Sequence, residues 1–160
     1  MIRDEQVSLR PVTEGDDDFI FSLYASTREQ EMALVPWNAE QKSAFVRMQY
    51  EAQKRHYRAE FPGAAHDIIN VDETPVGRLY LNRRGDLLHI LDITLLPRLR
   101  GQGTGGLVLR RVLEEARVAG KPATIYVETF NPSLRLFERL GFRRDHEQGV
   151  QLLLKWQPNP

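Results

Sequence analysis

The spacing of hydrophobic and polar positions predicts a strand and then helices in the first third of the chain. Residues 7–10 alternate between polar and apolar, as a strand does, and residues 19–24 carry apolar side chains at helical spacing. A longer amphipathic helix is predicted over residues 40–59, where apolar side chains recur every three or four positions before a Pro-Gly pair.

The middle of the chain changes to strand-like runs separated by short turns. Residues 68–71, 76–81 and 87–96 are rich in β-branched and apolar side chains. The breaks between these runs contain Asp, Gly, Pro and Thr, which are common turn residues. This segment therefore predicts an antiparallel meander of three strands.

The last third predicts a helix between two strands. A glycine cluster opens a periodic apolar helix that Gly120 ends, and residues 123–128 follow as a strand. Two strands joined through a helix run parallel. A short helix over residues 134–140 and a closing strand over residues 149–156 complete the pattern. We expect one α/β domain over residues 1–160, with a mixed, mostly antiparallel sheet.

Composition and charge limit the classes of function. The 22 Lys plus Arg residues cancel the 22 Asp plus Glu residues, which leaves no global field to attract nucleic acid or an anionic membrane. The absence of cysteine excludes disulfide frameworks, thiolate catalysis and cysteine-based zinc sites. No apolar stretch is long enough for a membrane span, and the first residues lack a signal-peptide pattern. We expect a cytoplasmic protein that needs no metal.

The glycine cluster is the most informative segment. Gly101, Gly103, Gly105 and Gly106 lie just before the predicted helix. Glycines allow several backbone N–H groups to converge at a helix N-terminus, where the macrodipole favours phosphate oxygens. Residues 98–121 also carry six basic side chains against two acidic ones. The expected ligand of this segment is an anion.

A dinucleotide site is the less favoured interpretation of the same cluster. Gly101, Gly103 and Gly106 match G-x-G-x-x-G, and Glu128 lies where a ribose-binding carboxylate would follow. However, four residues separate the preceding strand from the first glycine, and the chain shows one β-α-β unit where that fold needs several. A dinucleotide oxidoreductase therefore remains an alternative.

Two motifs resemble the GNAT superfamily of acyl-coenzyme A dependent N-acetyltransferases. The run Arg100-Gly101-Gln102-Gly103-Thr104-Gly105 fits the pyrophosphate loop of that family, R/Q-x-x-G-x-G/A. Val127 and Asn131, followed by residues 136–142, resemble a second element, V-x-x-x-N and then L-Y-x-x-x-G-F, except at Phe137. The resemblance covers nearly the whole chain. It implies a GNAT-like fold whose parallel β-α-β unit is splayed to hold coenzyme A.

The resemblance also assigns residues to acetyl-coenzyme A. It implies that the pantetheine arm pairs with the backbone near Ile93 and Leu95, which also forms the oxyanion site, and that Asn131 bonds the same arm. The residues expected at the pyrophosphate are Arg100, Gly101, Gln102, Gly103, Thr104, Gly105 and Gly106. Phe137 replaces a family Tyr that protonates the departing thiolate, and a Phe has no proton to give.

Acetyl transfer needs groups that move protons. His89 interrupts an apolar run where several family members place a basic residue, which makes it a candidate catalytic base. A hydrogen-bonded structural histidine is the equally weighted alternative. Asp92 is a second candidate, unless it is paired with Arg78 or Arg84. Tyr126 is a candidate proton donor to the thiolate, but strand alternation alone does not say whether its side chain faces the cleft.

The acceptor is expected to be a primary amine of a small molecule or peptide. In the family that this chain resembles, the first two helices form the acceptor wall, and the segment of residues 26–57 contains acidic and aromatic candidates: Glu29, Glu31, Trp37, Tyr50 and Tyr57. The sequence leaves open whether the protein forms a homodimer. A non-catalytic acyl-coenzyme A binding or regulatory module is the alternative function, because Phe137 departs from the family pattern.

Overall fold

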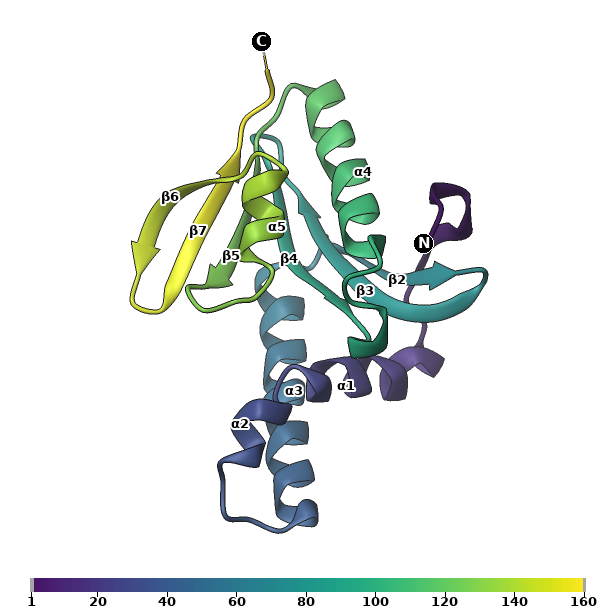
Figure 1. Cartoon of the computed structure of the whole chain (residues 1–160), viewed down its shortest axis with the longest axis vertical. Helices are drawn as coiled ribbons and strands as arrows, with labels where there is room; N and C mark the ends of the chain where they lie inside the picture. Colours follow the sequence, from purple (N-terminus) through teal and green to yellow (C-terminus); the bar gives the residue numbers. More distant parts are fainter. Residues whose placement is uncertain (1, 160) are drawn as a thin grey trace.

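The computed structural model describes residues 2–159 as a seven-stranded sheet with helices on both faces (Figure 1). The sheet order is β1-β2-β3-β4-β5-β7-β6. The strands are β1 (Val7–Pro11), β2 (Ala65–Val71), β3 (Thr74–Arg83), β4 (Leu88–Leu95), β5 (Ala123–Glu128), β6 (Arg143–Gln148) and β7 (Gln151–Trp156). The helices are α1 (Asp17–Ser26), α2 (Glu29–Ala33), α3 (Ala39–Glu60), α4 (Thr104–Ala119) and α5 (Leu134–Arg139).

One pair of neighbouring strands in the described sheet, β4 and β5, is parallel, and the other pairs are antiparallel. The expected mixed α/β sheet with one parallel β-α-β unit is therefore confirmed. The predicted meander is the run β2-β3-β4, and the predicted helix over residues 40–59 is α3. A sheet with one parallel pair also lacks the repeated β-α-β units of a dinucleotide fold.

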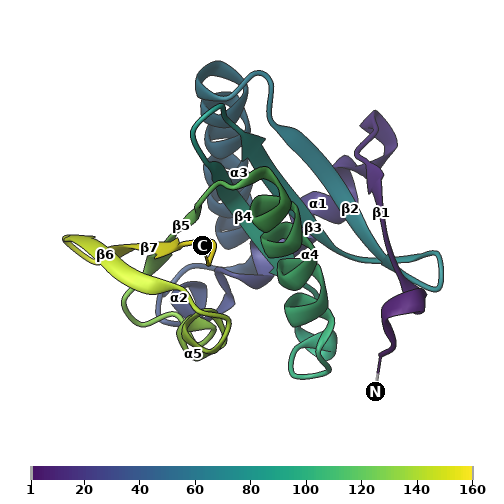
Figure 2. The ribbon, with the colours of Figure 1, turned by 90° about the horizontal axis from the view of Figure 1, so that it is seen from above.

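The two faces of the sheet carry separate cores. Figure 2 shows α4 on one face and α1 with α3 on the other. The α4 face holds the larger core, which includes Val108, Val112 and Ala116 of the helix and Ile90 and Ile125 of the strands. The opposite face holds a smaller core: Ile20, Tyr24, Val46, Tyr50 and Ile68. Successive side chains along one strand therefore point into different cores.

The start of α3 follows from a capping box. The side chain of Asn38 accepts a hydrogen bond from the Gln41 backbone N–H at 2.8 Å, and the Gln41 side chain accepts one from the Asn38 N–H at 3.1 Å. This reciprocal pair satisfies two donors that a helix N-terminus otherwise leaves free. The long helix that faces β2, β3 and β4 therefore begins at a defined residue.

Two elements were not predicted from the sequence. Strand β6 pairs with β7, but all six of its residues are exposed, so it has no alternation of buried and exposed positions. Helix α2 is only five residues long and none of its residues is buried. Within residues 2–159, no helix combines the length and the apolar composition needed to cross a membrane.

Candidate active site

A gap opens in the sheet where β4 and β5 part. The two strands pair at three positions, the last being Ile90 with Ile125. The Leu96 N–H donates to the Val76 carbonyl at 2.8 Å, so Leu96 bonds toward β3. Because bonding direction alternates along a strand, the backbone groups of Ile93 and Leu95 point away from β3 and into this gap. They are the two residues that the family resemblance assigned to a pantetheine arm.

A bulge in β4 sets this alternation. Leu81 of β3 pairs with Ile90, and the preceding Tyr80 pairs with Asp92, so Leu91 is the extra residue. A bulge shifts the strand by one position and changes which backbone groups face each neighbour. Leu91 therefore directs the free backbone groups of the following residues toward β5.

The glycine loop ends in the free N-terminus of α4. Gly101 and Gly103 have φ values of +80° and +90°, a backbone region that favours glycine. The first intrahelical bond runs from the Leu107 N–H to the Gly103 carbonyl at 3.0 Å, so the amides of Thr104, Gly105 and Gly106 lie in the first turn, where intrahelical acceptors are missing. The first turn has no acidic side chain. This loop has the geometry of an anion site.

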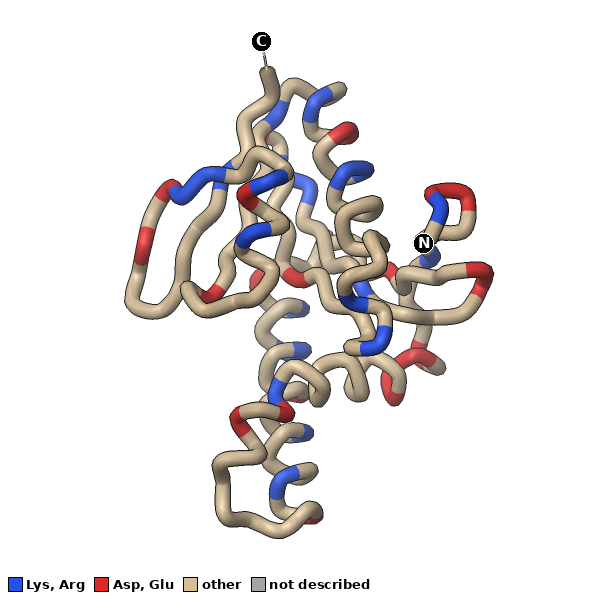
Figure 3. The backbone as a smooth tube through the Cα atoms, in the orientation of Figure 1, with Lys and Arg blue, Asp and Glu red and all other residues tan. Residues whose placement is uncertain are grey.

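Several features at the loop agree with an anionic ligand. An added Cβ at Gly101 or Gly103 would meet no atom within 4 Å, so the loop surface is open. The hydroxyl of Thr104 is buried and has no hydrogen-bond partner within residues 2–159. The Gln102 side chain donates to the Arg98 carbonyl at 3.1 Å and ties the loop together. Basic residues lie at the loop and along α4 (Figure 3).

His89 lies at the mouth of the gap on the α3 face. Its Nδ1 is 2.7 Å from the Thr124 hydroxyl oxygen, and its ring stands edge-on to Tyr126 with centroids 5.6 Å apart. Burial, followed by the positive charge of Arg84, lowers the pKa of His89. The imidazole is therefore neutral at neutral pH, and Nε2 is the nitrogen that Thr124 leaves free.

Tyr126 points to the same face as His89. Alternation along β5 sends Ile125 and Val127 into the core beneath α4, whereas Tyr126 is 49% exposed. The orientation that sequence reasoning left open is thereby resolved, and Tyr126 is next to the candidate base. Thr124, which sequence reasoning missed, lies on this face too. The register of the parallel pair, in which Thr124 lies opposite His89, is the feature that would have identified Thr124.

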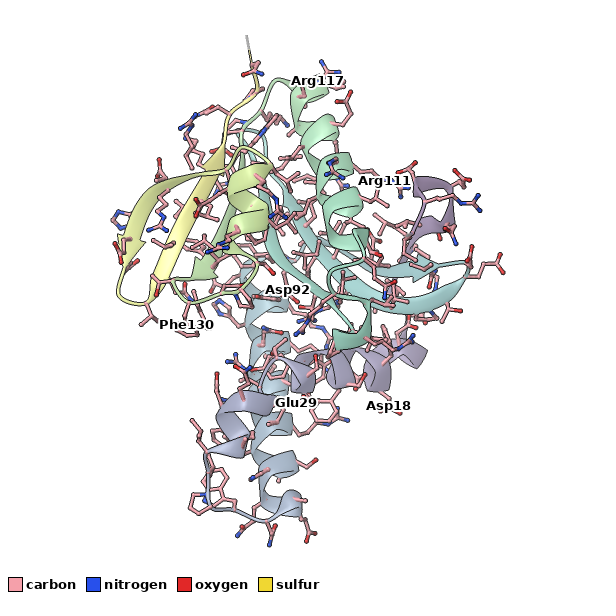
Figure 4. The ribbon with its side chains drawn as sticks, in the orientation of Figure 1. Asp18, Glu29, Asp92, Arg111, Arg117 and Phe130 are labelled. Carbon is pink, nitrogen blue, oxygen red and sulfur yellow. The ribbon has the colours of Figure 1, made fainter. Side chains whose placement is uncertain are left out.

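Asp92 is held by an arginine. Its Oδ2 accepts from the Arg78 Nε at 2.6 Å and from the Thr94 hydroxyl at 3.0 Å. The Arg78 side chain is only 4% exposed, against 24% for Asp92. Figure 4 shows Asp92 where the sheet meets the α3 layer. The pairing with Arg78, one of the sequence alternatives, is the one observed.

Asn131 and Phe137 have local structural roles. The Asn131 Oδ1 accepts from the Ser133 N–H at 2.7 Å and so stabilises the turn before α5. The amide nitrogen of its side chain remains as a donor. Phe137 is 3% exposed and packs edge-on against Phe142, with ring centroids 5.6 Å apart. Phe137 thus lies in the core beneath α4 and presents no polar group.

The residues expected at the acceptor wall divide into two groups. Tyr50 is buried and donates to Asp17 at 2.7 Å, and Glu31 pairs with Arg28 at 2.9 Å. Glu29 and Trp37 are exposed, and Glu29 is labelled on α2 in Figure 4. Within residues 2–159, no group of three or more acidic or histidine side chains is arranged to hold a metal ion.

Comparisons with known proteins agree with this geometry. A family model described as "Acetyltransferase (GNAT) family" matches residues 20–142. No curated protein matches the chain. The crystal structure of a PaiA N-acetyltransferase from Thermoplasma acidophilum in complex with coenzyme A is similar, with a TM-score of 0.72 at 14% identity over 94% of this chain and 98% of that chain.

Two further crystal structures are similar to this chain. An acetyltransferase from Thermus thermophilus gives a TM-score of 0.67 at 16% identity, over 95% of this chain and 97% of that chain. A GNAT family acetyltransferase from Elizabethkingia anophelis with acetyl-CoA bound gives 0.63 at 15% identity, over 96% and 99%. At these identities the structures show a common fold.

Proposed function

The chain belongs to the GNAT acetyltransferase family, and from this premise we propose that it transfers an acetyl group from acetyl-coenzyme A to a primary amine. The amine of a small molecule or peptide attacks the thioester directly while both substrates are bound. The observation that carries the proposal is the parting of β4 and β5 after Ile90 and Ile125, which frees backbone groups beside His89 and Tyr126.

The fit of this chain to coenzyme A rests on two sets of backbone groups. The amides of the loop and first turn of α4 suit the pyrophosphate, with Arg100 exposed beside them. The outward backbone groups of Ile93 and Leu95 suit the amides of a pantetheine arm. The remaining side-chain donor of Asn131 suits the same arm. The thioester supplies an activated acetyl group, and the protein supplies orientation and proton transfer.

We assign proton acceptance to His89. For Nε2 to take a proton from the attacking amine, Nδ1 must carry its own hydrogen and donate it to Thr124. The lowered pKa of His89 keeps the ring unprotonated at neutral pH. Backbone N–H groups in the gap stabilise the negative charge that develops on the carbonyl oxygen.

We assign proton donation to Tyr126. When the C–S bond breaks, the sulfur takes up a proton, and the phenol of Tyr126 is the exposed donor next to His89. Phe137 cannot serve, because it has no hydroxyl. Asp92 is assigned to holding Arg78, since two donors already occupy its carboxylate.

A thiol-release assay over a panel of primary amines tests the proposal. Turnover that Tyr126→Phe and His89→Ala both reduce would support these roles. Acetyl-coenzyme A at about 100 times its Kd should also stabilise the fold by about 2.7 kcal/mol, and NADH should do much less. Binding without turnover on any amine would instead favour a non-catalytic acyl-coenzyme A binding module. Equal stabilisation by NADH would contradict the coenzyme A site.

A further inference from the structure

A cavity of about 320 Å³ lies between α3 and the strands β2 and β3, and the segment between β1 and α1 closes its rim. Two of the residues expected at the acceptor wall, Tyr50 and Tyr57, line it, but the residues assigned to proton transfer and to coenzyme A do not. None of His89, Thr124 and Tyr126 lines it, nor does any residue of the glycine loop. The cavity therefore needs its own explanation.

A buried arginine with an unused nitrogen lines this cavity. The Arg78 side chain is 4% exposed, and its Nε and Nη2 donate to Asp92 at 2.6 Å and to Gln53 at 2.8 Å. Its Nη1 has no hydrogen-bond partner within residues 2–159. This nitrogen is not one of the buried atoms that lack a partner, so it is accessible from the cavity and free to donate to a ligand. The side of the cavity formed by β3 thus offers a site for an anionic oxygen.

His66 and Arg58 add two further donors. The His66 ring stacks on Tyr80 with centroids 4.1 Å apart, and its Nε2 is buried with no hydrogen-bond partner in the described chain. Burial and then the positive charge of Arg78 lower the pKa of His66 to about 4, so the ring is neutral and carries one N–H. In the tautomer with that hydrogen on Nε2, the ring is a donor toward a bound anion. Arg58 on α3 lines the cavity and forms no ion pair with a described carboxylate.

The remaining lining restricts the ligand. Asp17 accepts from Tyr50 at 2.7 Å and from Lys54 at 3.0 Å, which leaves Glu14 as an unpaired lining carboxylate within residues 2–159. Its charge disfavours a second negative group on the ligand. Val12 and Ile20 contribute apolar surface. The volume is at the lower end of the range for ligand sites, about 300–1,000 Å³.

We propose that this cavity binds a small monocarboxylate with an apolar body, whose carboxylate oxygens meet Arg78 Nη1, His66 and Arg58. The apolar part lies against Val12 and Ile20. Because Arg78 also holds Asp92 of β4, the ligand attaches to the residue that links this cavity to the strand carrying His89. The binding site itself does not depend on acetyl transfer.

The test uses the full chain without acetyl-coenzyme A, with 4-methylpentanoate as the probe and its neutral amide, 4-methylpentanamide, as the matched control. Titration calorimetry should show the carboxylate binding at least tenfold more tightly than the amide. Arg58→Gln should weaken the carboxylate roughly tenfold, as expected for the loss of one charge-assisted contact. Arg55→Gln, at an exposed position of the same helix that does not line the cavity, should leave it unchanged.

Nuclear magnetic resonance of the histidine rings gives a second readout that does not depend on a variant. The His66 ring signals should shift with the carboxylate, and the pKa of His66 should rise, because a nearby anion favours the protonated ring. Unmoved His66 signals, equal binding by the amide, or equal binding by inorganic phosphate would overturn the proposal. Since acetyl-coenzyme A is absent, none of these results depends on the proposed transferase activity.

Discussion

The phenol of Tyr57 donates a hydrogen bond to the main-chain carbonyl of Leu91 at 3.2 Å. Leu91 is the extra residue of the bulge in β4 and has no partner in the β3 register. Burial and the negative charge of Asp92 raise the pKa of Tyr57 to about 12, so the phenol remains a donor at any physiological pH. Helix α3 therefore supports the bulge that aims Ile93 and Leu95 into the gap.

Tyr57→Phe should lower both stability and coenzyme A affinity. The ring stays edge-on to Tyr80, at a centroid distance of 5.1 Å, so only the hydrogen bond is lost. We expect the free energy of unfolding to fall by about 1 kcal/mol, and acetyl-coenzyme A to bind more weakly because the bulge loosens. Urea denaturation and calorimetry measure the two effects. Tyr80→Phe, whose hydroxyl has no partner within residues 2–159, is the control and should change stability little.

Gly103→Val should abolish acetyl-coenzyme A binding and leave α4 folded. With φ at +90°, a β-branched residue is strained by roughly 1–2 kcal/mol, and its side chain would project from an open loop surface into the space proposed for the pyrophosphate. Helical circular dichroism should persist. Gly85→Val is the matched control, because Gly85 also has open space around it but lies outside the left-handed region. Undiminished affinity in folded Gly103→Val would place the anion elsewhere.

The pH dependence of kcat/KM should follow His89. A base is active when deprotonated, so the rate should rise with pH, and a lowered pKa places the midpoint below the ordinary value of about 6.5. Arg84→Gln removes a positive charge that lowers this pKa, so the midpoint should move to higher pH. His89→Ala should reduce the rate by about 10²–10⁴-fold. A His89→Ala enzyme with an unaltered rate and profile would transfer the role to another base or to water.

Thr124→Val should slow turnover by removing the partner of His89 Nδ1. The substitution keeps the side-chain shape, and Thr124 is 4% exposed, so its backbone position should persist. Without the hydroxyl, the tautomer with a free Nε2 is no longer favoured, and we expect roughly tenfold lower kcat/KM with a shifted pH midpoint. Thr124→Ser should restore both, because it returns the oxygen. A purely structural role predicts lower stability with an unchanged pH profile.

Most of the fold could be predicted from the sequence, because turn residues and changes in hydrophobic periodicity separate most of the helices and strands. It missed β6, whose six residues are all exposed, since an edge strand without a buried face leaves no apolar alternation. It also missed α2, which is short and has no buried residue. The GNAT family and the mixed sheet are confirmed by the family match and by the strand order.

The candidate site was predictable only where its residues are neighbours in the chain. The glycine loop is continuous, so its motif was visible. The contact between His89 and Thr124 spans 35 residues and depends on the register of the parallel pair, which no local pattern encodes. The sequence offered both Arg78 and Arg84 as partners of Asp92, and the choice between them depends on the bulge at Leu91. The burial of Phe137 depends on how α5 packs against the sheet.

The pair formed by Arg10 and Asp16 should make stability depend on pH in the acidic range. Asp16 is buried and accepts from Arg10 Nη1 and Nη2, each at 2.8 Å, and from the Thr13 N–H at 2.8 Å. The hydrogen bonds from Arg10 and then from Thr13 hold the pKa of Asp16 well below its usual range. The unfolded chain therefore binds a proton first as pH falls. The contribution of the Asp16 carboxylate to the free energy of unfolding is therefore complete above its unfolded pKa of about 3.9, and it is lost as the pH falls below that value.

Asp16→Asn should destabilise the protein by about 2 kcal/mol at pH 7, because a buried charge-assisted network is broken. The difference between the natural chain and the variant should shrink as pH falls below about 4, since the natural carboxylate then loses its advantage. Urea denaturation at a series of pH values from 7 to 2 measures this convergence. Asp18→Asn is the control, because Asp18 lies two residues further on, exposed in the first turn of α1 (Figure 4), and should change stability by no more than a few tenths of a kcal/mol. A constant difference between Asp16→Asn and the natural chain across this range would mean that Asp16 acts through packing and not through its charge.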